Sequence, residues 1–195
     1  MTQYPKVSPA PDMKISATPQ MIERGKYLAN TFASCTDCHS VRDWNKLGGP
    51  LVDGTLGKGG EDYGEGAGFI PAKNITPDKE TGIGNWTDGE IFRAITMGVD
   101  KDGEPLGPMM PFLYYRNMDE EDVKSIIAYI KTIPPVKNEV KEHKFNFPVN
   151  LIFRTLPTEP DFKKIPDKSN TVAYGEYYSG GCMSCHSPMD KGEFI

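Results

Sequence analysis

The sequence has no apolar run approaching the roughly 18 to 20 residues that a helix needs to cross a bilayer. Residues 1–14 also lack the apolar centre of a secretory signal. Basic residues are not in excess: 22 Lys and Arg stand against 27 Asp and Glu, for a formal net charge of -5. That balance argues against a nucleic-acid-binding protein, which needs a basic surface. Because no segment alternates apolar and polar residues as a half-buried strand does, we expect an all-α fold.

Cysteine and histidine are scarce, with four and three copies, but nearly all of them fall in two short motifs. The motifs are Cys35-Thr36-Asp37-Cys38-His39 and Cys182-Met183-Ser184-Cys185-His186. Two thiols on one helical turn can each form a thioether to a haem vinyl group, which holds the following histidine under the iron. We therefore predict covalent haem c at both motifs, with His39 and His186 as the proximal iron ligands.

Two other uses of paired cysteines fit less well. The common zinc pattern places its two pairs about 15 to 20 residues apart, whereas nearly the whole chain separates these two. A thioredoxin-like redox pair belongs in a βαβ setting, and the sequence shows none.

The second axial ligand of the first haem is predicted in the segment 107–112, which reads Gly-Pro-Met-Met-Pro-Phe. Flanking prolines would stiffen a loop that presents a sulfur atom to iron. Met110 is the preferred ligand and Met109 the reserve, although methionines commonly only fill core space. A His/Met pair raises the reduction potential of haem iron relative to two histidines.

The remaining candidates near the irons stay open. His143 could ligate the second haem, but it lies in a charged run, 141–144, that is typical of a solvated surface. Met189 follows the second motif too closely to reach the far face of that haem, so the sixth ligand of the second iron is undetermined. Lys73, Arg93 and Arg116 are alternative partners for the haem propionates.

Local signals divide the chain into four parts. Prolines make residues 1–17 an extended arm that we expect to be poorly packed. Residues 18–136 form the first domain, with helices starting at Thr18, at Thr87 with a Thr-x-x-Glu capping box, and at the acidic segment 119–122. Residues 137–169 have no clear period and are interpreted as a linker. Residues 170–195 are interpreted as the start of a second, incomplete domain.

A short repeat supports that last interpretation. Arg24-Gly25-Lys26-Tyr27-Leu28 precedes the first motif, and Tyr174-Gly175-Glu176-Tyr177-Tyr178 precedes the second. The second copy resembles the opening of another domain of the same kind.

Residues 20–136 resemble a class I-type cytochrome c domain of the multi-haem cytochrome subunits of bacterial membrane-bound alcohol and gluconate dehydrogenases. The resemblance rests on Arg24-Gly25-x-Tyr27-Leu28, the first motif with Ser40, Asn74-Ile75-Thr76-Pro77-Asp78, Thr81-Gly82-Ile83-Gly84-x-Trp86-Thr87, Met110-Pro111, Ala128-Tyr129-Ile130 and Pro134-Pro135-Val136. It implies a helical fold with its first and last helices crossing near the haem, His39/Met110 ligation and a periplasmic location. Such subunits carry two or three haem domains in tandem.

These observations predict an electron carrier between a dehydrogenase or quinol-oxidising partner and a downstream cytochrome or oxidase. Because haem c matures outside the cytoplasm, we expect an export signal or membrane anchor in a segment outside these residues. The alternative is a peroxidase-like enzyme with an open iron position at the second haem. A redox-silent tethering domain is the third hypothesis.

Overall fold

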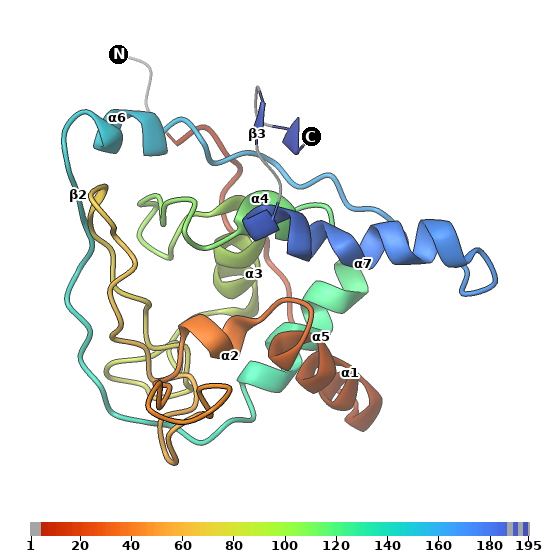
Figure 1. Ribbon diagram of the computed structural model, residues 1–195, viewed down its shortest axis with the longest axis horizontal. Coiled ribbons are helices and arrows are strands. Elements are labelled where there is room, and N and C mark those ends of the chain that lie inside the picture. Colours follow the sequence, from red (N-terminus) through yellow and green to blue (C-terminus); the bar gives the residue numbers. More distant parts are fainter. Residues whose placement is uncertain (1–4, 187–188, 191–192, 195) are drawn as a thin grey trace.

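Helices dominate the computed structural model, which describes residues 5–186, 189–190 and 193–194 (Figure 1). The helices are α1 (Pro19–Asn30), α2 (Cys35–Cys38), α3 (Asp88–Met97), α4 (Phe112–Tyr115), α5 (Glu120–Ile130), α6 (Val149–Phe153) and α7 (Thr171–His186). The strands form two antiparallel pairs, β1 (Gly68–Phe69) with β2 (Lys144–Phe145) and β3 (Met189–Asp190) with β4 (Glu193–Phe194). These two-residue strands had no signal in the sequence, and long loops connect the helices.

The core is built on the crossing of α1 with α5, which lie side by side in Figure 1. Leu28 of α1 and Ile127 of α5 are fully buried, and each such side chain stabilises the fold by about 1.5 to 3 kcal/mol. Gly25 allows the two backbones to touch, because a Cβ there would lie 1.8 Å from the carbonyl oxygen of Ser125. The crossing therefore needs glycine at this position.

The predicted helix starts are confirmed. The Thr18 hydroxyl accepts a hydrogen bond from the Met21 amide at 3.2 Å, with Pro19 at the first helical position. Thr87 and Glu90 form the complete capping box of α3. The side chain of Asp119 caps α5.

The N-terminal arm is extended as expected, but the expectation of poor packing is wrong. Met13 and Ile15 pack against the core, and the Ile15 amide donates to the Asp88 carboxylate at 2.7 Å. A Cβ at Gly89 would lie 1.8 Å from the Pro11 carbonyl oxygen, so the arm also touches the first turn of α3. Met13 and Ile15 are two positions apart, which lets one side of an extended chain face the core.

Residues 137–145, here called the strap, turn back over the first domain instead of leaving it. The Asn138 amide donates to the Thr81 hydroxyl at 2.9 Å, and its side chain donates to the Lys58 carbonyl at 2.8 Å. The strap ends in β2, whose Phe145 pairs with Gly68 of β1. Residues 137–169 are thus not uniformly a linker, because this first stretch packs on the domain before α6 and α7 follow.

Helix α7 lies across the other side of the molecule from the strap (Figure 1). Its Tyr177 ring stacks on Phe32, with centroids 6.0 Å apart, and the Tyr177 hydroxyl accepts from the Asp119 amide at 2.7 Å. Among the described residues, no helix combines the length and the hydropathy that crossing a bilayer requires.

Candidate haem site

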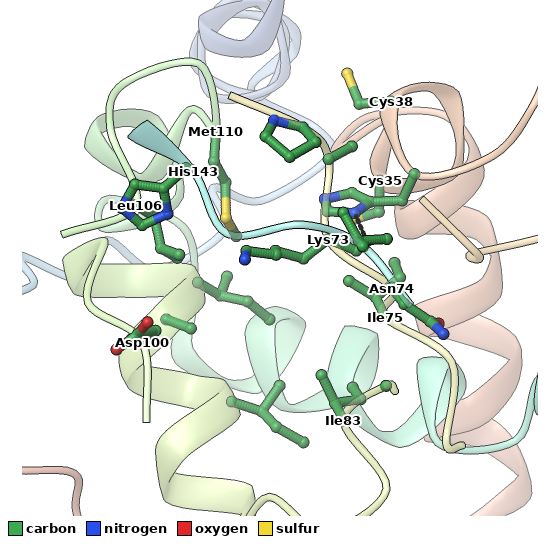
Figure 2. A pocket seen from close by; sticks show the side chains of 18 of the residues that line it. Cys35, Cys38, Lys73, Asn74, Ile75, Ile83, Asp100, Leu106, Met110 and His143 are labelled. Carbon is green, nitrogen blue, oxygen red and sulfur yellow. Dashed lines mark hydrogen bonds between the residues drawn. The ribbon is translucent and has the colours of Figure 1, made fainter. Parts of the chain in front are cut away.

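A cavity of about 620 Å³ lies beside the first cysteine motif (Figure 2). Its wall is formed by α2, α3, the loops at 70–75 and 100–111, and the strap. Cys35, Ile75 and Ile83 lie on one side, and Met110, Leu106 and His143 lie on the other. The two sides leave a mostly apolar space between potential iron ligands.

Helix α2 places the two thiols of the first motif at this cavity. Cys35 and Cys38 begin and end its single turn, and both line the space. Ser34, which precedes the turn, is left-handed with φ of 49°. Burial raises the pKa of Cys35 to about 12, so its sulfur is a thiol at neutral pH.

The His39 imidazole is partly buried and oriented by one hydrogen bond. Its Nδ1–H donates to the Lys73 carbonyl oxygen at 2.6 Å, since a carbonyl can only accept. The second ring nitrogen, Nε2, therefore carries the lone pair, which is the arrangement found in metal-binding histidines. Burial lowers the pKa of His39, which keeps the ring neutral and able to bind iron.

The backbone around His39 is held from two directions. The His39 amide donates to the Cys35 carbonyl at 3.0 Å, and its carbonyl accepts from the Gly59 amide at 2.9 Å. The buried Ser40 hydroxyl accepts from the Gly57 amide at 3.0 Å. The glycine-rich loop that follows the motif thus supports the imidazole.

Both candidate methionines reach the cavity, but they differ in exposure. Met110 is partly buried against the core and its sulfur points into the cavity (Figure 2). Met109 is 37% exposed. Pro111 then caps α4, which continues directly from the methionine loop. Met110 is thus the more buried of the two candidates, and the choice of Met110 over Met109 as iron ligand stays a prediction.

His143 is not the solvated residue that its charged neighbours suggested. It is half-buried, lines the same cavity as His39 and Met110, and lies against Phe145 with ring centroids 4.5 Å apart. Burial and the nearby Lys73 ammonium lower the pKa of His143. The expectation was wrong because a local charge run does not reveal that the strap returns to the cavity.

Of the three cations left open as propionate partners, Lys73 lines the cavity. Its ammonium pairs with Glu142 of the strap at 2.6 Å. Arg93 donates to the Asp100 carbonyl, and Arg116 donates to the Glu159 carbonyl at 2.8 Å. Both guanidinium groups are thus bound to backbone carbonyl oxygens.

Two tyrosines of the wall were missed by the sequence analysis. Tyr115 of α4 is almost fully buried, and its hydroxyl donates to the Ala33 carbonyl near the first motif. Burial raises the pKa of Tyr115 well above its ordinary value. Tyr63 also lines the space, from within the glycine-rich loop. Neither position carries a periodic or motif signal that could have identified it.

The second motif lies at the end of α7, and its Cys182 side chain is exposed. The side chains of Cys185, His186 and Met189 lie outside the described part of the structure. The predicted second haem site therefore stays a prediction.

The donor set of the first cavity fits a covalently attached haem. Two thiols on one turn, an imidazole with its Nε2 lone pair available and a thioether sulfur surround an apolar space. Within the described ranges, no three or more His, Cys, Asp or Glu side chains gather as a metal site. The volume of about 620 Å³ and the apolar wall suit a group as large as a porphyrin.

Comparison with known proteins agrees with this donor set. The cytochrome c family pattern matches residues 22–134. The gluconate 2-dehydrogenase cytochrome c subunit of Pantoea cypripedii is 32% identical over 88% of this chain and 39% of its own length. The cytochrome c subunit of alcohol dehydrogenase (quinone) from Gluconacetobacter polyoxogenes is 30% identical over 86% of this chain and 36% of its own length.

A third relative is the fructose dehydrogenase cytochrome subunit of Gluconobacter japonicus. It is 35% identical over 75% of this chain and 28% of its own length. The chain thus spans less than two fifths of each of these three relatives. The resemblance to dehydrogenase cytochrome subunits is confirmed. Since the family pattern covers the first motif, the methionine loop and the helices around the cavity, the chain belongs to the cytochrome c family.

Proposed function

We propose that this chain carries electrons through a haem bound covalently at Cys35 and Cys38. One observation carries the proposal: both thiols, the His39 imidazole and the Met110 thioether line one apolar cavity. His39 and Met110 would both bind the haem iron, which would leave it no open position for a substrate. Electron transfer is the chemistry that a six-coordinate haem of this kind supports.

When bound, the haem supplies a one-electron couple between ferric and ferrous iron. The residues of the chain hold it and adjust its environment. Thioethers at Cys35 and Cys38 keep the porphyrin from dissociating, and the Lys73 carbonyl fixes the orientation of His39. A thioether ligand at Met110 and the low-polarity wall raise the potential relative to a solvated bis-imidazole haem.

The proposal extends to a second haem at Cys182, Cys185 and His186, in a second domain that starts at about residue 170. Electrons would enter from a dehydrogenase or quinol-oxidising partner and leave to another cytochrome or an oxidase. The names of the relatives support a dehydrogenase as the donor. A periplasmic location follows, because haem c is attached outside the cytoplasm.

Intact mass and a redox titration of periplasmically matured protein test this function. We expect the mass of two covalent haems and a reversible absorbance change. Cys35→Ala/Cys38→Ala and Cys182→Ala/Cys185→Ala should each lose one haem. Absence of covalent haem, or a redox-silent spectrum, would overturn the proposal. Saturable peroxide turnover far above that of free haem would favour the peroxidase-like enzyme instead.

The axial ligand is tested separately by two single variants. Met110→Ala should abolish the sulfur-to-iron absorption band of the oxidised protein, because the thioether is removed. Met109→Ala should keep the band, since its more exposed side chain is not the ligand. The opposite pattern would assign the iron to Met109.

A further inference from the structure

Besides His39, the wall of the haem cavity contains a second imidazole. His143 lines the space on the same side as Met110 (Figure 2). It enters from the strap, more than thirty positions beyond the methionine loop in the sequence. Imidazole nitrogen and thioether sulfur are both atom types that can bind haem iron. Here one of each lies in the same part of the cavity.

Aromatic packing holds the strap against the methionine loop. A Cβ at Gly107 would lie 3.1 Å from the Phe145 ring, so this ring rests on the backbone three residues before Met110. The Phe145 ring also meets Phe153 edge-on, with centroids 5.0 Å apart. His143 lies against the same Phe145 ring, with centroids 4.5 Å apart. The imidazole therefore has a built position beside the loop that presents the sulfur.

Burial lowers the pKa of His143, and the charged groups around its ring are of both signs. The Lys73 ammonium pairs with the Glu142 carboxylate of the strap at 2.6 Å. The acidic side chains of Asp100 and Glu104 line the cavity nearby, together with Lys101. A neutral imidazole offers a lone pair to iron without releasing a proton.

We propose that His143 is a reserve axial ligand, whose imidazole takes the sixth position on the first haem when the methionine sulfur is lost. The proposal rests on the proposed function, since it needs haem at the first motif. In the exchange an iron–sulfur bond is replaced by an iron–nitrogen bond, and no electron is transferred. Peroxide would trigger the same exchange by transferring one oxygen atom to the methionine sulfur, which becomes a sulfoxide while the peroxide is reduced to water.

The exchange has a consequence for function. An iron that lost its sulfur without a replacement would have an open position at which peroxide could bind. With His143 in that position the iron would stay six-coordinate, and the haem would change to a bis-imidazole form of lower potential. His143 would thus prevent a damaged carrier from becoming a peroxidase.

The test removes both sulfurs and keeps the core volume. In Met109→Leu/Met110→Leu, the ferric haem should remain low-spin, with a bis-imidazole signature in electron paramagnetic resonance and a lower potential than wild type. Adding His143→Ala should convert the haem to high-spin, and free imidazole should restore the low-spin state. His143→Ala alone should leave the wild-type sulfur band unchanged.

A high-spin double variant would overturn the proposal. So would a triple variant as low-spin as the double, or an amine signature, which would point to Lys73 as the replacement. If the double variant fails to fold, wild-type protein with chemically oxidised methionines is measured instead. A high-spin spectrum of that protein would likewise overturn the proposal. Wild-type protein without covalent haem would contradict the proposed function itself, which keeps the two failures distinct.

Discussion

Single hydrogen bonds decide which atoms of the candidate site can act. The Lys73 carbonyl accepts from Nδ1 of His39, which leaves the lone pair on Nε2 available to bind iron. Elsewhere a bidentate contact gives the buried Asp122 carboxylate its counter-charge, because Arg24 Nε and Nη2 donate to its two oxygens at 2.9 and 2.8 Å. These hydrogen bonds raise the pKa of Arg24 further above its ordinary value.

Arg24→Ala should therefore destabilise the protein. The change leaves a buried carboxylate without its partner, and we expect a loss of about 2 kcal/mol in the free energy of unfolding by urea. This is below the roughly 3 to 5 kcal/mol of a fully buried pair because Arg24 is partly exposed. Arg154→Ala is the matched control, since its pair with Glu104 is exposed, and it should cost under about 1 kcal/mol. Equal losses in the two variants would contradict this assignment.

At the scale of elements, two glycines of the sequence repeat differ in their surroundings. Gly25 of α1 lies where a Cβ would meet Ser125 at 1.8 Å and Tyr129 at 2.9 Å. Gly175 of α7 has nothing within 4 Å of its Cβ position. The same residue type at corresponding positions thus serves a helix crossing in one copy and faces open space in the other.

Gly25→Ala should force α1 away from α5. The cost of overpacking is about 1 to 3 kcal/mol, and it should exceed the gain of about 1 kcal/mol that alanine brings to a helix. Gly175→Ala meets no neighbouring atom and gains the helix propensity of alanine, so its free energy of unfolding should be unchanged or slightly higher. Thermal and urea unfolding of the haem-loaded variants measures both. A stabilising Gly25→Ala would show that the crossing tolerates a methyl group.

At the scale of the whole molecule, Asp88 links three segments that are distant in the sequence: the N-terminal arm, the start of α3 and the end of α5. Its carboxylate accepts from the Ile15 amide of the arm and pairs with Lys131 after α5. Burial alone would raise the pKa of Asp88, but the Ile15 amide and the Lys131 ammonium outweigh it and lower the pKa. The arm is thus fastened to the domain by the Asp88 carboxyl group, whose ionised form these contacts favour.

Asp88→Asn should show this as a dependence on pH. Because the pKa is lower in the folded state, the carboxylate stabilises the fold fully above its unfolded pKa of about 3.9 and stops doing so as pH falls through the folded pKa. The variant should lose roughly 1 to 2 kcal/mol at pH 7, and its difference from wild type should shrink below about pH 4. Asp53→Asn, at an exposed loop position, is the control and should change the stability at pH 7 by less than about 0.5 kcal/mol. A pH-independent difference at Asp88 would contradict the ionised contact.

Much of the architecture could be predicted because its signals are local. Thr18, Thr87 with its capping box and the acidic segment 119–122 predicted three helix starts correctly, since each signal acts within one turn. Paired cysteines on one turn likewise carry their chemistry in their spacing. The short strands β1 and β2 escaped prediction, because two residues are too few to show a period.

By itself, the sequence determined the haem motif, the main helices and the membership of the cytochrome c family. The tertiary structure alone decided that the arm packs at Asp88, that Lys73 orients His39 and that the strap brings His143 to the cavity. The physical reason is distance along the chain. A motif or a cap within one helical turn can be recognised from neighbouring residues. A contact between segments far apart in the sequence forms only after the chain has folded back on itself.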